Sequence, residues 1–192
     1  MCEKESEAAE MAEQDWKIEK LYHYMIDMLL EQELKLGYYE EALRLYYPRE
    51  SLIHILEIEE NPAELQDALR KFADTYQEKL GSISFRDNEG RYCILIPAAG
   101  IRYVHEHAEH SPFLQEFIDC MRDGHATIEE LRSVFQKYSD HVSFEKVDHG
   151  EFDYVLFFED GIPDEYRYCI SMHGAHAIYH RFNEQDYVEL GL

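Results

Sequence analysis

Apolar residues recur at helical spacing through much of the first 81 residues. From Trp16 onward they fall three or four positions apart, which predicts one long helix that ends at Gly37. Residues 1–15 are rich in Glu and Ala and are expected to form a helical extension that frays. The tetrapeptide 61–64 combines an N-cap Asn, a first-turn Pro and an acidic third position, so a second helix should extend from there to Gly81.

A short alternating segment interrupts this helical pattern. Every second position of this segment carries one of the residues Leu43, Leu45 and Tyr47, with Arg44 and Tyr46 between them. This pattern predicts a strand, because successive side chains of a strand point to opposite faces. Pro48 then fits the first turn of a short helix that extends to about Glu57.

After Gly81 the period of the pattern changes from that of a helix to that of a strand. Alternating residues on both sides of a turn at 87–90 predict a β-hairpin over 82–96. The expected later elements are helices at 98–107, 112–122 and 127–138, and strands at 142–144, 152–158, 166–172 and 175–182. The predicted class is therefore α+β: N-terminal helices followed by antiparallel strands with an inserted helical trio. This order in the C-terminal half is also consistent with a winged-helix-like module.

The distribution of charge favours one domain. Residues 1–80 carry 9 basic and 20 acidic side chains, and residues 81–192 carry 9 and 21, so charge does not set either half apart. We therefore expect a single domain over residues 1–192, with a helical part at 16–81 and a mixed part at 82–192.

Composition excludes several classes of protein. The chain has 41 Asp and Glu against 18 Lys and Arg, a formal net charge of −23, yet 45% of its residues are hydrophobic. That hydrophobic content excludes an acidic disordered tail, and no apolar run is long enough for a transmembrane helix. Phosphate backbones and anionic membranes should repel so negative a chain. We expect a basic or neutral protein partner, with no nucleic acid and no membrane, and the sequence does not indicate the oligomeric state.

The N-terminus and the cysteines favour the cytoplasm. The first residues are acidic and lack the apolar segment of a signal peptide. The four cysteines are widely spaced, as is typical of free thiols in a reducing compartment.

Candidate catalytic groups do not form a known motif. The histidines in segment 105–110 lack the H-E-x-x-H spacing of a zinc helix. His176 and His180 could share a metal on a helical turn, but on a regular strand their Cα atoms lie about 13 Å apart. The acidic loop at 159–165 is expected to be solvated. We predict no metal and no cofactor, and we leave open whether the chain is an enzyme. Two alternative functions are a metal-assisted hydrolase that uses the C-terminal histidines and a winged-helix-like regulator.

The candidate binding residues are Tyr38, Arg44, Tyr46, Tyr47 and Arg49. Aromatic residues with arginine are typical of binding hot spots. They are also typical of a packed corner in which tyrosine hydroxyls find partners, and packing is the interpretation that we favour. Because catalytic motifs are missing, the function that the sequence favours is a non-enzymatic, acidic protein-interaction module.

The same segment carries a family resemblance. Its pattern K-L-G-Y-x-x-E-A-x-R-L-Y-Y-P-x-x-S-L, from Lys35 to Leu52, resembles the signature of a bacterial family of single-domain proteins of about this length. That family is classed as a domain of unknown function. The resemblance implies a bacterial origin and a match over the full chain, and it implies no reaction and no catalytic residues.

The even spread of negative charge generates a prediction about stability. Like-charge repulsion should destabilise the folded chain most at low ionic strength, where screening is weakest. The melting temperature should therefore rise when salt is increased from a low concentration to about 0.15 M. Thermal unfolding followed by circular dichroism checks this, and a melting temperature that stays level would contradict it.

Overall fold

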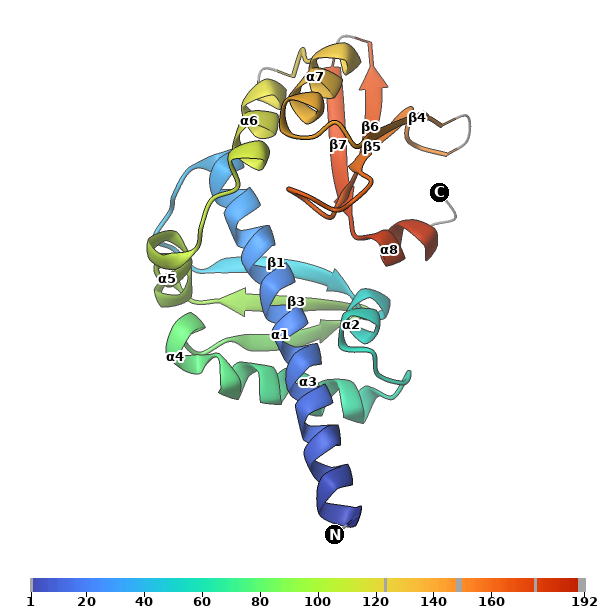
Figure 1. Cartoon of the computed structure of the whole chain (residues 1–192). Helices are drawn as coiled ribbons and strands as arrows, with labels where there is room; N and C mark the ends of the chain where they lie inside the picture. Colours follow the sequence, from blue (N-terminus) through green and yellow to red (C-terminus); the bar gives the residue numbers. More distant parts are fainter. Residues whose placement is uncertain (1, 123, 148–149, 175, 190–192) are drawn as a thin grey trace. The chain divides into compact units, whose positions relative to one another are not determined.

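The computed structural model describes residues 2–122, 124–147, 150–174 and 176–189 (Figure 1). The class is α+β as predicted, with helices and two antiparallel sheets of three and four strands. The chain divides into two compact units, Met1–Ala108 and Glu109–Leu192, so the hairpin and the helix after it belong to the N-terminal unit. The expectation of one domain over the whole chain stays a prediction. No described helix has both the length and the apolar character needed to cross a membrane.

The first unit contains α1 (Cys2–Leu36), β1 (Leu43–Pro48), α2 (Arg49–Leu56), α3 (Pro62–Thr75), α4 (Gln77–Leu80), β2 (Ser84–Asn88), β3 (Arg91–Ile96) and α5 (Ala98–His107). α1 ends where predicted, because Gly37 adopts a φ of 84° that other residues rarely take. Its amide donates to the Glu33 carbonyl at 2.8 Å and closes the last turn.

The helix that Asn61 opens is shorter than predicted. The Asn61 side chain accepts a hydrogen bond from the Ala63 amide at 3.1 Å, as expected of an N-cap. The helix does not continue to Gly81, however, because the backbone bends at Tyr76 and α4 is a separate turn. At this bend the Tyr76 ring stacks on Tyr22 of α1 with centroids 4.1 Å apart, a contact that the local sequence pattern does not encode.

The sheet of the first unit has the strand order β1-β3-β2, with every neighbour antiparallel. The register places Leu45 opposite Ile94 and Tyr47 opposite Tyr92, and all four side chains are buried. α1 crosses one face of this sheet in Figure 1, and its apolar residues share a core with the buried strand positions. The strand residues between these buried positions therefore lie on the opposite face of the sheet.

The second unit contains α6 (Pro112–Met121), α7 (Ile128–Tyr138), β4 (Val142–Lys146), β5 (Tyr154–Phe158), β6 (Arg167–His173), β7 (His176–Phe182) and α8 (Glu184–Glu189). Its four strands follow one another in the order β4-β5-β6-β7. The predicted start signals of both longer helices are present: Ser111 accepts from the Leu114 amide, and Thr127 and Glu130 form a capping box.

Two observations bear on the predicted winged helix. The first helix of the expected trio, α5, belongs to the other compact unit. In the described part of the chain, α6 and α7 are followed by a four-stranded meander rather than by a single hairpin. The winged-helix interpretation therefore stays a prediction.

Aromatic side chains fill the core of the second unit. The Tyr168 ring is fully buried on β6, and the rings of Phe117, Phe135 and Phe113 lie 4.7, 5.2 and 5.7 Å from it, all close to edge-on. Such edge-to-face pairs stabilise a core beyond the area that they bury.

A buried ion pair closes this core, and it corrects one expectation. Asp164 was expected in a solvated loop, but its side chain and that of Arg181 are each only 6% exposed, with Nη2 and Oδ2 3.1 Å apart. The same Oδ2 accepts from the Tyr168 hydroxyl at 2.9 Å, and Oδ1 accepts from the Tyr166 amide at 2.9 Å. The loop folds inward because the Asp164 carboxylate gains these hydrogen-bond partners. The sequence of the loop alone does not predict them.

Removing the carboxylate of Asp164 should destabilise the second unit. Asp164→Asn leaves the Arg181 guanidinium buried without its counter-charge, so the free energy of unfolding should fall by about 3 kcal/mol. Glu165→Gln is the matched control, because Glu165 is exposed in the same loop and its loss should stay within about 0.5 kcal/mol. Urea unfolding followed by circular dichroism compares them, and equal effects of the two variants would show that the pair is not a structural constraint.

Candidate functional site

The structure separates the five predicted binding residues into four environments. Tyr38 lies in the loop after α1, beside a surface pocket. Arg44 and Tyr46 lie on the solvent face of β1, whereas Tyr47 points into the core. Arg49 begins α2. The five residues therefore do not form one site.

Two of these residues have structural roles. Tyr47 is only 6% exposed and belongs to the core. The Arg49 Nη2 atom lies 2.6 Å from Asp87 Oδ2 on β2, and this hydrogen bond is the main reason that the pKa of Arg49 is raised. The packed-corner interpretation stays a prediction, although the burial of Tyr47 is in keeping with it. It does not describe Tyr46, which is 50% exposed.

The pocket beside Tyr38, called here the tyrosine pocket, has a volume of about 210 Å³. It is lined by Leu29, Gln32, Glu33, Leu36, Gly37, Tyr38, Tyr39, Glu41, Ala42, Leu43, Ile101 and Val104. Most of these residues come from the end of α1 and the loop after it, with the start of β1 and one side of α5 completing the wall. The sharp turn at Gly37 is what brings the loop back over α1.

A contact between α1 and α5 holds one wall of the tyrosine pocket. Glu33 Oε1 lies 2.7 Å from His105 Nδ1, and the Glu33 side chain is 16% exposed. The Tyr38 ring stacks on the His105 ring with centroids 3.9 Å apart and planes at 14°. Burial, followed by the Glu40 carboxylate, raises the pKa of the Tyr38 phenol above its ordinary value.

The tyrosine pocket combines two kinds of surface. Leu29, Ile101 and Val104 contribute apolar side chains, while Glu33 and Glu41 contribute carboxylates. A lysine or arginine side chain has the same two parts, an apolar stem and a charged head. The aromatic faces of Tyr38 and Tyr39 suit such a cation as well.

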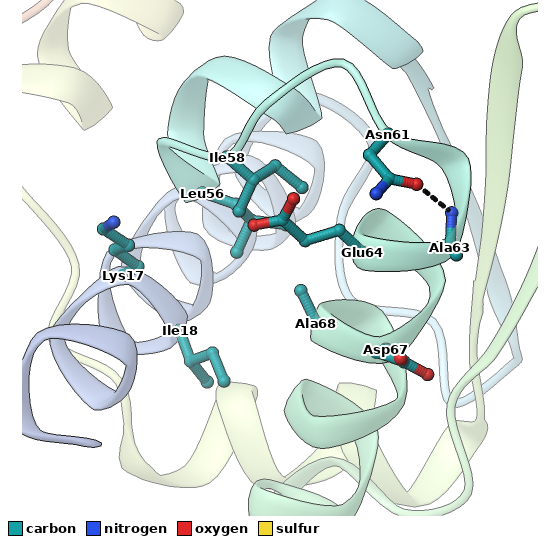
Figure 2. Close-up of a pocket in the computed structure, with 9 residues that line it drawn as sticks. All are labelled: Lys17, Ile18, Leu56, Ile58, Asn61, Ala63, Glu64, Asp67 and Ala68. Carbon is teal, nitrogen blue, oxygen red and sulfur yellow. Dashed lines mark hydrogen bonds between the residues drawn. The ribbon is translucent and has the colours of Figure 1, made fainter. Parts of the chain in front are cut away.

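A second pocket lies between α1 and the start of α3 and has a volume of about 420 Å³ (Figure 2). It is lined by Lys17, Ile18, Leu56, Ile58, Asn61, Ala63, Glu64, Asp67 and Ala68. In Figure 2 the Glu64 carboxylate extends over the apolar floor toward Ile58, with Lys17 on the opposite wall.

Three of the polar groups that line this second pocket already serve the fold. Asn61 caps α3, Asp67 pairs with Arg70 at 2.9 Å, and Lys17 Nζ donates to the Glu57 carbonyl at 3.2 Å. The walls carry charges of both signs, so they favour neither a cationic nor an anionic ligand. We therefore take the tyrosine pocket as the candidate site.

The thiols of Cys120 and Cys169 show no sign of activation. Burial is the main cause that raises the pKa of both Cys120 and Cys169, and for Cys169 it reaches about 12. A nucleophilic cysteine needs the opposite shift, because the thiolate is the reactive form.

The described histidines include one close pair, because the His125 and His176 ring centroids lie 5.0 Å apart. No three His, Cys, Asp or Glu side chains in the described ranges come together as a group that could hold a metal ion. His176 Nδ1 lies 3.2 Å from the Gly124 carbonyl oxygen, while the His180 ring packs against Phe152 and Phe182. Because β7 is a strand, the Cα atoms of His176 and His180 are expected to lie too far apart for the two side chains to share a metal ion.

Fold and pockets define an α+β protein with an acidic, aromatic surface pocket. A family model described as "Domain of unknown function, E. rectale Gene description (DUF3877)" matches residues 18–191, and the chain belongs to this family. The pattern from Lys35 to Leu52 lies within the matched residues, although the match does not test it as a signature. No curated protein and no solved structure matches the chain.

The lack of a three-ligand group among the described residues generates a prediction about zinc. Adding Zn²⁺ at a modest excess should leave the melting temperature unchanged, because a ligand stabilises only when it binds the folded state more tightly than the unfolded one. The same null result is expected for His176→Ala. A zinc-dependent rise that His176→Ala abolishes would instead support the metal-assisted hydrolase.

Proposed function

We propose that this protein is a non-enzymatic protein-interaction module of the bacterial cytoplasm, and that its tyrosine pocket receives a lysine or arginine side chain of a basic partner. The observation that supports the proposal most is the placement of Glu33 and Glu41 around an apolar floor that opens to solvent. The free thiols of Cys93, Cys120 and Cys169 are in keeping with a reducing compartment.

The size of the pocket supports a side chain rather than a metabolite. Small-molecule sites usually enclose roughly 300–1,000 Å³. The tyrosine pocket, at about 210 Å³, lies below that range, and one long side chain matches it better. A side chain presented by a protein also needs no enclosing walls, because the rest of the partner covers the rim.

The charge of the chain supports a basic partner. With a formal net charge of −23, the protein attracts cationic surfaces over several ångströms and accelerates their approach at low salt. Exposed tyrosines on the rim provide area for contact at little cost in side-chain entropy, and Tyr39 is 65% exposed. Attraction at long range and the pocket at short range therefore favour the same class of partner.

Labelled peptides test this proposal directly. An alternating Arg-Ser peptide of eight residues should bind the full chain in a fluorescence-anisotropy titration. Glu41→Gln should weaken that binding about two- to fivefold, because it removes one exposed partner of the guanidinium. Tyr38→Ala should weaken it more, since the pocket loses a wall and the His105 ring loses its stacking partner.

The matched control is Glu59→Gln, which removes an exposed carboxylate from the loop between α2 and α3. It removes the same single negative charge as Glu41→Gln without touching the tyrosine pocket. Loss of affinity that is equal in Glu41→Gln and Glu59→Gln would show that only net charge matters, and the pocket would then have no role.

No observation in the described residues favours the two alternative functions. The first turn of α7, which would enter a DNA groove in a winged helix, carries Glu129 and Glu130. Glu130 is held there by Thr127, whose amide donates to its carboxylate at 2.8 Å. An acidic first turn is unsuited to phosphate contact.

A further inference from the structure

One face of the first unit's sheet carries positive charge, although the chain as a whole is strongly negative. On this face the strand register brings together residues that lie far apart in the sequence. They are Arg44, Tyr46 and Pro48 on β1, Arg91, Cys93 and Leu95 on β3, and Ser84, Arg86 and Asn88 on β2. None of these nine positions is acidic, and three are arginine. We call this surface the arginine face.

The arginines of this face have no partner in the described structure. Arg44, Arg86 and Arg91 are all exposed, and none of them forms a side-chain hydrogen bond or ion pair with a described residue. Most other described cations do contact a carboxylate or an aromatic ring, as Arg102 contacts Glu40 at 2.8 Å. In a chain with more than twice as many acidic as basic side chains, three unpaired arginines on one sheet face are unexpected.

The register fixes the spacing of these arginines. Arg86 lies opposite Cys93 on β3, Arg44 lies opposite Leu95, and Arg91 lies two residues from Cys93 along the same strand. Alternate residues of a strand are about 7 Å apart and neighbouring strands about 5 Å apart, so the three Cα atoms lie within about 15 Å of one another. Cys93 is at the centre of the face, and it is half-buried, as is Leu95.

We propose that the arginine face binds an extended acidic segment of a partner protein. Alternate side chains of an extended chain repeat at about 7 Å, which is the spacing of successive rows on the face. Carboxylates at every second position can therefore meet the guanidinium groups, with which they form strong, geometrically specific hydrogen bonds. Leu95, Cys93 and the half-exposed Tyr46 provide apolar contact between the charged rows.

Charge favours a short protein segment over a nucleic acid. Unpaired charges on a sheet face act within a Debye length of about 8 Å at physiological salt. A short acidic segment can remain within that range of the arginine face. A nucleic acid carries a phosphate at every nucleotide and would extend over the acidic remainder of the chain, where the net charge repels it.

This proposal is independent of the function assigned to the tyrosine pocket. The two surfaces share no residue, because Leu43 lines the pocket from the buried face of β1 whereas Arg44 points the other way. Failure of one proposal leaves the other standing. The net charge alone indicates only basic or neutral partners, and it does not indicate this surface.

The test uses the full chain and a labelled peptide of eight residues in which Glu and Ser alternate. Fluorescence anisotropy at about 0.05 M and 0.15 M salt should show binding that weakens as salt rises. The combined variant Arg44→Gln, Arg86→Gln and Arg91→Gln should weaken it at least about fivefold, since three exposed charge pairs are lost. A labelled single-stranded DNA of eight thymidines is titrated in parallel and should bind more weakly than the peptide.

The matched control changes three exposed cations elsewhere, Arg70→Gln, Arg122→Gln and Arg132→Gln, and lowers the net charge equally. Circular dichroism verifies that both combined variants fold. The proposal is overturned if the wild-type chain does not bind the Glu-Ser peptide at low salt, or if both variants weaken binding equally. It is also overturned if the DNA binds more tightly than the peptide and loses its affinity in the sheet variant, because the ligand is then a nucleic acid.

Discussion

The first unit depends on the two-residue alternation of side chains along its three strands. Leu45 and Tyr47 must be buried with Tyr92 and Ile94 to form the core beneath α1, so the residues between them are forced to the other face. This constraint places Tyr47 inside and Arg44 outside, although they lie close together in the sequence. The part of the predicted binding corner that lies on β1 is thereby divided into a core position and an exposed sheet face.

The same constraint explains how a strongly acidic chain can present surfaces of opposite sign. The tyrosine pocket carries Glu33 and Glu41, whereas the sheet face carries three arginines that form no ion pair with a described residue. In the second unit, by contrast, two opposite charges are buried: Asp164 and Arg181 form an ion pair within an aromatic core, hydrogen-bonded to its side chains. Net charge therefore describes how the protein attracts or repels partners at long range, and the local placement of charges decides what each surface can bind.

Much of the fold could be predicted because the signals for helices, caps and turns are local. Gly37 ends α1 and Asn61 caps α3, and each acts within one turn of helix. The remainder depends on contacts between distant segments. Glu33 and His105 are 72 residues apart, and Arg86 joins Arg44 only because β3 lies between β1 and β2. Asp164 gave no signal of burial, since an acidic loop is typically solvated and its partner Arg181 lies 17 residues away on β7.

We propose that the first unit has two separate binding surfaces that select ligands of opposite charge. A nuclear magnetic resonance titration of ¹⁵N-labelled full-length protein with both peptides present can distinguish the two surfaces. We expect the Arg-Ser peptide to shift amide signals around Glu33, Tyr38 and Glu41, and the Glu-Ser peptide to shift those of Arg44, Cys93 and their neighbours, without competition. Shifts of one common set of amides, or mutual displacement of the peptides, would contradict it.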